Sequence, residues 1–143
     1  MASIPPVDED DLQALRGLLR DAGLPDDVGE HRSTLVAVAR DGAEVIGGVA
    51  VEVYDGHGLL RSLVVDPRFR SSGIGTGLVA AAEAAAGSHG LSGLSMLTET
   101  AAGFFLRLGY VAVARDELPG PVQESSEFTR LCPETAAAMT KPL

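Results

Sequence analysis

The first half of the chain combines one helical pattern of leucines with three runs typical of strands. Leucines recur every three or four positions within Asp8–Ala22, acidic residues stand at its start, and a glycine and a proline follow its end. These features predict an amphipathic helix. Thr34–Arg40, Ala43–Tyr54 and Leu59–Val65 are apolar and β-branched and are separated by short Asp-Gly turns, which predicts three consecutive antiparallel strands. A glycine pair at 47 and 48 predicts a bulge or kink inside the second of them.

The second half of the chain alternates between helices and strands. Leucine, valine and alanine positions after Gly73 predict a helix that ends near Gly87 or Gly90. The pattern then predicts a core strand, a short helix, a further strand and a last strand at the sheet edge, at Leu94–Thr98, Ala101–Leu108, Tyr110–Arg115 and Ala136–Lys141. Antiparallel strands followed by a strand–helix–strand unit indicate a mixed α/β domain.

Composition narrows the class of protein. A length of 143 residues predicts a single domain over residues 1–143. The net charge is −9, from 20 acidic and 11 basic residues, with Lys141 as the only lysine, which argues against a nucleic-acid binder. The single cysteine, Cys132, allows no internal disulfide, and the three histidines have no metal-ligand spacing. No signal peptide or bilayer-spanning stretch is recognisable, so we expect a soluble, cytoplasmic protein that binds neither nucleic acid nor membranes.

A glycine-rich loop joins the third predicted strand to the next helix. It reads Arg-Ser-Ser-Gly-Ile-Gly-Thr from Arg70 to Thr76. Glycines let backbone N–H groups approach a ligand and a helix N-terminus adds partial positive charge, so this loop favours phosphate or pyrophosphate. The absence of a lysine excludes the ATP-binding Walker A loop. The dinucleotide fingerprint fits poorly, because Leu78 stands where its last glycine belongs. The structural alternative is a turn of this sequence that binds nothing.

Two motifs in this region together resemble the GNAT family of N-acetyltransferases. Arg70-x-x-Gly73-x-Gly75, after a strand that ends Leu63-Val64-Val65-Asp66-Pro67, is similar to that family's coenzyme A-binding motif. Ala101-x-x-Phe104-Phe105-x-x-Leu108-Gly109-Tyr110 is similar to its second signature. The predicted order of elements is also the family's. The resemblance implies an α/β fold with a mixed, mostly antiparallel central sheet of six to seven strands flanked by helices.

The resemblance implies acetyl-CoA as the co-substrate and assigns roles to individual positions. The pantetheine chain would pair with the backbone of the strand before the loop, the pyrophosphate would lie on loop amides, and an amide near Val65 would polarise the thioester carbonyl. The coenzyme-binding residues implied in this way are Leu63, Val64, Val65, Arg70, Ser71, Ser72, Gly73, Ile74, Gly75, Thr76, Thr98 (in place of a frequent asparagine) and Phe105.

The proton-transfer groups usual in the family are missing from the matching positions. Phe105 stands where a tyrosine often protonates the leaving thiolate, and the strand before the motif lacks the common acid. We therefore consider two candidate catalytic residues, Glu99 as a base and Arg61 as a clamp for a substrate carboxylate. Glu99 could instead only stabilise the next helix N-terminus, and Arg61 could form a structural ion pair or be an exposed residue at a sheet edge. Strand parity predicts that Arg61, Leu63 and Val65 share one face.

A narrower resemblance suggests an acceptor. Leu60–Val65, Phe104–Tyr110 and the tail from 127 to 133 with Met139 and Lys141 resemble small N-acetyltransferases found with arsenic-resistance genes. This implies acetylation of a toxic amino acid such as a phosphinothricin- or arsinothricin-like compound, with Arg61 gripping its acid groups. We predict an acetyl-CoA-dependent N-acetyltransferase for a small-molecule amine, with a homodimer as a family-level expectation. The alternatives are a coenzyme-binding module without catalysis and an enzyme that acetylates proteins.

Overall fold

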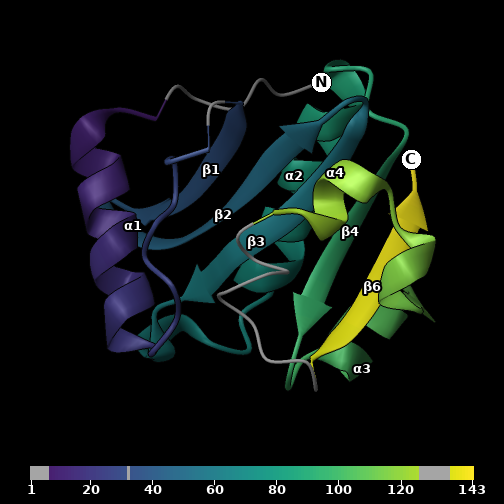
Figure 1. The fold of residues 1–143 in the computed structure, drawn as a ribbon. Coiled ribbons are helices and arrows are strands. Elements are labelled where there is room, and N and C mark those ends of the chain that lie inside the picture. Colours follow the sequence, from purple (N-terminus) through teal and green to yellow (C-terminus); the bar gives the residue numbers. More distant parts are fainter. Residues whose placement is uncertain (1–6, 32, 126–135) are drawn as a thin grey trace.

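The computed structural model describes residues 7–31, 33–125 and 136–143, which form a six-stranded sheet with helices on both faces (Figure 1). In chain order the elements are α1 (Glu9–Asp21), β1 (Thr34–Asp41), β2 (Glu44–Tyr54), β3 (His57–Val65), α2 (Ile74–Ser88), β4 (Gly93–Thr98), α3 (Ala102–Arg107), β5 (Val111–Val113), α4 (Gly120–Gln123) and β6 (Ala137–Pro142). Short 3-10 turns occupy Pro67–Phe69 and Arg115–Glu117. The predicted α/β class and the mostly antiparallel sheet of six to seven strands are confirmed.

The strand order of the sheet corrects one prediction. The order is β1-β2-β3-β4-β6-β5, and all neighbours are antiparallel except the parallel pair β3 and β4. The last strand is therefore not at the edge, because β6 pairs with both β4 and β5. Its buried Ala138 and Met139 suit an interior strand, whereas Val111 on the three-residue edge strand β5 is exposed.

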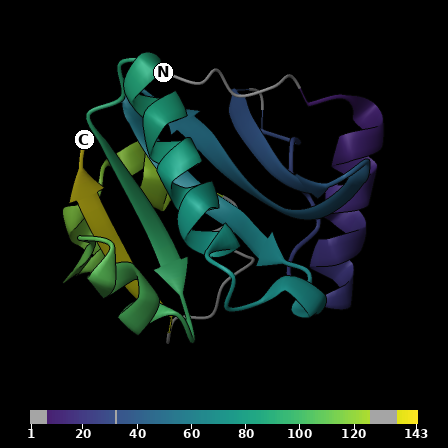
Figure 2. The same ribbon diagram turned by 180° about the vertical axis from the view of Figure 1, so that it is seen from behind.

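Helices cover the two faces of the sheet separately. Helix α1 places Leu15 and Leu19 against Ala50 and Val64 on one face. Helix α2 covers the opposite face, where its small and branched side chains pack among strand residues and Phe105 (Figure 2). The acidic start of α1 predicted from the sequence forms a reciprocal capping box, in which Asp8 and Asp11 accept each other's backbone N–H groups. No helix among the described residues combines the length and the apolar character needed to cross a bilayer.

A β-bulge interrupts the pairing of β2 with β3. Gly48 lies opposite Val64 and Ala50 opposite Arg61, so β3 has one residue more than β2 between these pairs. The bulge includes Ser62, a non-glycine residue with a φ of 59°. The irregularity predicted at the glycine pair is thus present. In the pairing with β3 the extra residue belongs to β3, and in the pairing with β1 the extra residue is Ile46 of β2, next to Gly47. Gly48 itself permits close helix packing, since a Cβ there would lie 2.6 Å from Leu15 Cδ1.

Strands β3 and β4 pair only at their beginnings. Their parallel register includes Gly58 with Leu94 and Leu59 with Ser95, and ends there. Beyond these pairs the two strands spread apart toward their carboxyl ends, as both ribbon views show (Figures 1 and 2). No other described strand pairs with the β4-facing edge of β3. The fold therefore leaves one strand edge without a strand partner in the middle of the sheet.

Candidate functional site

The glycine-rich loop forms a row of backbone donors at the N-terminus of α2. Gly73 takes the N-cap position with a φ of 83°, Ser71 also has a positive φ of 65°, and no side chain caps the helix. The first backbone N–H to find an acceptor is that of Gly77, which donates to the Gly73 carbonyl at 3.0 Å. Within the described chain, the N–H groups of residues 71–76 have no hydrogen-bond acceptor. A 15-residue helix adds its dipole to these donors, which makes the loop a cradle for an anion.

The arginines beside this cradle differ in whether their charge is available. Arg68 donates to Glu44 and Asp66, and these carboxylates raise the pKa of its guanidinium. Arg70 is exposed and has no ion-pair partner among the residues that the structure describes. Arg70 is therefore the cation that can add to the backbone donors of the cradle.

An apolar wall lies between the cradle and the end of β3. A Cβ at Gly75 would lie 3.7 Å from Phe104 Cζ and 3.9 Å from Val65 Cγ2, so the structure brings the loop, Val65 and α3 together. Phe105 itself is 4% exposed and belongs to the core, with its ring edge-on to Phe104 and Tyr110. The aromatic ring next to the predicted coenzyme site is therefore Phe104.

The neighbouring predicted positions have local roles. The Thr98 hydroxyl accepts the Ala101 N–H at 3.0 Å and so caps the start of α3. Glu99 follows the carboxyl end of β4 and is exposed. Tyr110, the last residue of the second signature, is buried, and its hydroxyl donates to Glu83 at 2.9 Å. Burial and this carboxylate raise the pKa of Tyr110.

The bulge in β3 overturns the prediction that Arg61 shares a face with Leu63 and Val65. Leu63 and Val65 pack against the core on the α2 side, whereas Val64 packs on the α1 side. Arg61 pairs with Ala50, which also packs on the α1 side. The extra residue at Ser62 shifts the alternation by one position, so Arg61 and Val65 face opposite sides of the sheet.

Arg61 is at the centre of a buried ionic cluster. Its guanidinium is 1% exposed and donates from Nη1 to Glu52 Oε2 at 3.2 Å, and from both Nη1 and Nη2 to Asp27. Glu52 is itself 3% exposed, and its other oxygen accepts the Tyr54 hydroxyl at 2.8 Å. The structural ion pair considered for Arg61 is therefore present.

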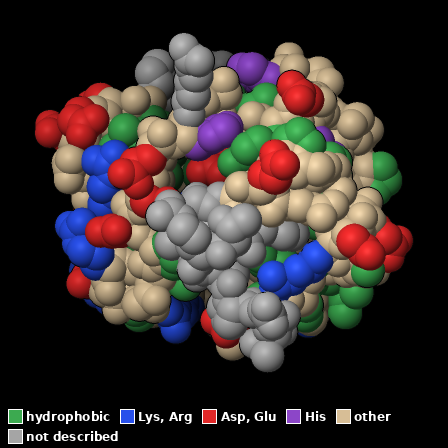
Figure 3. Space-filling view, viewed as in Figure 1, with side chains coloured by type: hydrophobic (Ala, Val, Ile, Leu, Met, Phe, Trp, Pro, Cys, Tyr) green, Lys and Arg blue, Asp and Glu red, His purple; other side chains and the backbone are tan. Residues whose placement is uncertain are grey.

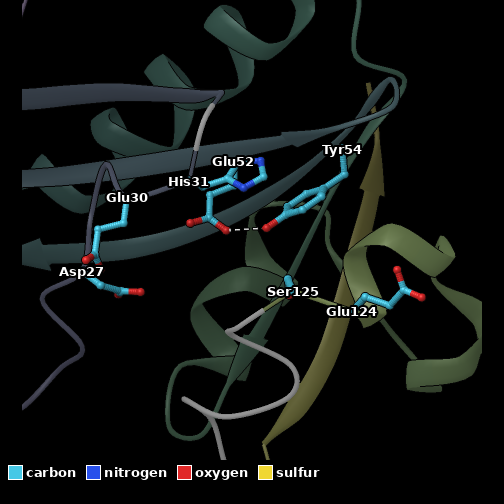
Figure 4. A pocket seen from close by; sticks show the side chains of 7 residues that line it. All are labelled: Asp27, Glu30, His31, Glu52, Tyr54, Glu124 and Ser125. Carbon is cyan, nitrogen blue, oxygen red and sulfur yellow. Dashed lines mark hydrogen bonds between the residues drawn. The ribbon is translucent and has the colours of Figure 1, made fainter.

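The partners of Arg61 form part of a pocket on the α1 side, which we call the acid-lined pocket. It has a volume of about 410 Å³ and is lined by Asp27, Glu30, His31, Glu52, Tyr54, Glu124 and Ser125 (Figure 4). The lining comes from the connection between α1 and β1, from β2 and from the end of α4. Figure 3 shows acidic and histidine side chains around a hollow on this face.

One wall of the acid-lined pocket is aromatic. The rings of His31 and Tyr54 lie 4.4 Å apart at an interplanar angle of 31°. His31 Nε2 lies 3.1 Å from the Val53 carbonyl oxygen. A carbonyl only accepts, so Nε2 carries a proton and donates. Glu99 is not among the described lining residues of this pocket.

Most of this pocket was not predicted from the sequence. Asp27, Glu30 and His31 lie in a connection without a motif, and no pattern in the sequence relates them to Tyr54 or Glu124. Glu52 carries the signal that could have found the pocket, since it is an acid inside the apolar run of β2. Cys132 and the resembling tail from 127 to 133 lie outside the described residues.

Comparisons with known proteins agree with this arrangement. The chain matches the model of the acetyltransferase (GNAT) domain over residues 32–112. No curated protein sequence matches it significantly. Its fold is similar to that of N-acetylglutamate synthase from Neisseria gonorrhoeae complexed with coenzyme A and N-acetyl-glutamate, with a TM-score of 0.77 and 19% identity over 99% of this chain and 34% of that one. The chain thus spans about a third of that relative.

Two further similar structures have nearly the length of this chain. A Mycobacterium tuberculosis protein in complex with CoA and NLQ has a TM-score of 0.76 and 21% identity, over 99% of each chain. An aminoglycoside 6'-N-acetyltransferase complexed with coenzyme A has a TM-score of 0.73 and 18% identity, over 99% of this chain and 95% of that one. At such identities the likeness is one of fold.

Proposed function

Because the chain belongs to the GNAT acetyltransferase family, whose model covers residues 32–112, we propose that it is an acetyl-CoA-dependent N-acetyltransferase acting on a small amine. The observation that carries this proposal is the row of unpartnered backbone donors at residues 71–76, next to the unpaired edge of β3. Such a pair of features suits a ligand with an anionic head and an extended amide chain.

Acetyl-CoA fits these features as the donor. Its pyrophosphate would accept from the N–H groups of residues 71–76, with Arg70 as the adjacent cation. Its pantetheine amides would pair with the edge of β3 over Leu63–Val65, where β4 has turned away. Coenzyme A is also the ligand named for the three similar structures described above.

The reaction requires little covalent participation from the protein. The acceptor nitrogen, after losing its ammonium proton, attacks the thioester carbonyl carbon and a C–N bond forms. The C–S bond then breaks, the nitrogen gives up a second proton to become the amide, and the departing thiolate takes up a proton to become the free thiol. A thiol with a pKa of about 8.5 is a competent leaving group without a strong acid beside it. The chain's contribution is therefore to hold both substrates in line and to offer an N–H near Val65 to the developing oxyanion.

Two predicted residues take different parts in this proposal. Glu99 follows the carboxyl end of β4, on the side where β3 and β4 diverge, and it stays our candidate for the group that receives the ammonium proton. Glu99→Gln should then lower kcat, while the KM for acetyl-CoA stays the same. Arg61 is a positioning residue, because its guanidinium is engaged by Glu52 and Asp27.

The second candidate function is a coenzyme-binding module without turnover. The observation behind it is that Phe105, at the position of the usual acid, has no hydroxyl and is buried in the core. Purified protein, acetyl-CoA and a panel of amines separate the two functions. Release of free thiol that depends on an amine supports the enzyme. Tight coenzyme binding without release from any acceptor refutes the enzyme and supports the module.

A toxic amino acid as the acceptor is the narrower form of the proposal. Its support is the resemblance to acetyltransferases found with arsenic-resistance genes. The contacts of Arg61 argue against it. Arg61 is the residue expected to bind the acid groups of the substrate, but its guanidinium already pairs with two carboxylates. Phosphinothricin therefore belongs in the acceptor panel, and turnover of it above all other amines would establish this form. The expected homodimer stays a prediction, to be tested by light scattering.

A further inference from the structure

We propose that the acid-lined pocket binds an acceptor that carries a second cationic group besides the amine to be acetylated, and no acid group. This inference rests on the proposed function, since it takes the pocket as the acceptor site. The pocket volume of about 410 Å³ is in the range of small-ligand sites, roughly 300–1,000 Å³. Strand β3 connects the two sites, because Arg61 binds two pocket residues and Val65 lies beside the cradle.

The charge of the lining favours a ligand with more than one positive charge. Four acidic residues, Asp27, Glu30, Glu52 and Glu124, line the pocket, and Figure 4 shows the Glu124 carboxylate turned outward, away from Tyr54 and Glu52. Arg61, which is not itself a lining residue, neutralises part of the negative charge of Asp27 and Glu52 through its ion pairs. Among the described residues, the carboxylates of Glu30 and Glu124 have neither an ion-pair nor a hydrogen-bond partner. A ligand with a single ammonium group would leave part of this negative charge uncompensated.

The arrangement of the lining favours an organic cation over a metal ion. The acidic residues come from three separate parts of the chain and line one cavity. The described residues include no group of three His, Cys, Asp or Glu side chains that could hold a metal ion. Figure 4 shows the Tyr54 ring along one side with its hydroxyl toward Glu52. An aromatic face of this kind also attracts alkylammonium groups.

The same lining disfavours acceptors with acid groups. None of the described lining residues is a lysine or an arginine. The guanidinium behind them already donates to two carboxylates. A substrate carboxylate would therefore enter a pocket of its own sign without a counter-ion from these residues, and like charges at close range repel.

Three amines of matched length test the proposal. Butylamine, 1,4-diaminobutane and 4-aminobutanoate share the reacting primary amine and differ only in the charge at the far end. We expect kcat/KM to be about tenfold higher for 1,4-diaminobutane than for butylamine at low ionic strength, and lowest for 4-aminobutanoate. The advantage of the diamine should shrink when the salt is raised from about 50 mM to about 500 mM. Equal values for diamine and butylamine, or a preference for 4-aminobutanoate, would overturn the inference.

Variants of the uncompensated carboxylates give a second readout. Glu30→Gln together with Glu124→Gln should lower the ratio of kcat/KM for diamine over butylamine several-fold. Asp10→Asn together with Asp21→Asn removes the same number of charges from exposed positions near the two ends of α1, outside the pocket lining, and should leave that ratio as it is. An equal drop in both proteins would show that only the net charge of the molecule matters.

Binding measurements separate this inference from the proposed function. Calorimetric titration of the coenzyme A-loaded protein with 1,4-diaminobutane and with butylamine needs no turnover. If the diamine binds more tightly and the Glu30 and Glu124 variants lose that preference, the inference stands even when no thiol is released with any amine. If thiol is released but the diamine binds no better than butylamine, the inference fails and the proposed function stands.

Discussion

At the scale of single residues, the buried cluster of Arg61, Glu52 and Asp27 connects stability with the acid-lined pocket. Arg61 and Glu52 are 1% and 3% exposed, so neither charge has water as an alternative partner. Arg61→Met should destabilise the protein by about 3–5 kcal/mol in urea unfolding, because it leaves Glu52 buried without its counter-ion.

Arg68→Met is the control for this experiment. Arg68 also bridges two carboxylates, but it is 64% exposed, so water and salt already screen its ion pairs. We expect its loss of stability to be much smaller than that of Arg61→Met. Equal losses would mean that the Arg61 cluster is solvated and that its burial has no energetic effect.

His57 makes stability depend on pH. Thr140 donates to the Leu94 carbonyl at 3.0 Å, so Ser95 donates to Thr140 and His57 Nε2 donates to Ser95 at 2.6 Å. Burial lowers the pKa of His57 below its ordinary value of 6.5. The unfolded chain therefore binds this proton at a higher pH than the folded one.

Because the pKa of His57 is lower in the folded than in the unfolded chain, acid should destabilise the fold. Above about pH 6.5, His57 should make the free energy of unfolding neither larger nor smaller as the pH changes. Below that pH the free energy of unfolding should fall, until the imidazole of the folded protein is also protonated. His57→Gln should flatten this part of the profile in urea unfolding between about pH 7.5 and pH 5. Identical slopes in both proteins would show that His57 is not responsible.

At the scale of elements, the cradle depends on the start of α2. A Cβ at Gly75 meets only ordinary contacts in the free protein, at 3.7 Å or more, but it fills space between Val65 and Phe104. Gly75→Ala should weaken coenzyme A binding about tenfold in calorimetry while stability stays the same or rises slightly. Gly77→Ala, with open space around its Cβ, is the matched control. Equal affinities in both variants would place the coenzyme elsewhere.

The sequence predicted elements well where one local pattern decides them. The leucine spacing of α1, the three hairpin strands and the loop before α2 all agree with the structure. The bulge at Ser62 could not be predicted, because one extra residue reverses the strand faces without a change in composition. The interior position of β6 depends on pairing with β4 and β5, which are distant in the sequence.

The site was predictable only where its residues are neighbours in the sequence. The cradle is one continuous segment, so a motif identifies it. The acid-lined pocket collects Asp27, Glu52 and Glu124 from three separate segments, and no local spacing relates them. The acid inside the apolar strand β2 was the one visible sign.

At the scale of the whole molecule, the net charge of −9 repels an anionic coenzyme as it approaches the protein. Attraction must then come from the backbone donors of residues 71–76 and from Arg70 at short range. We expect the association rate constant for coenzyme A to rise with salt in stopped-flow experiments, because salt screens the long-range repulsion first. A steep fall with salt would instead indicate a steering field of positive charge around the loop.

The central claim, that the chain transfers an acetyl group from acetyl-CoA to a small amine, is tested most directly by product analysis. Purified protein is incubated with acetyl-CoA and 1,4-diaminobutane, butylamine and phosphinothricin in turn, and free thiol and the mass of each amine are followed together. We predict thiol release matched one to one by an N-acetylated amine, and loss of both in a variant with valine substituted at Gly73 and Gly75. Coenzyme A that binds at the loop while no amine in the panel gains an acetyl group would contradict the claim.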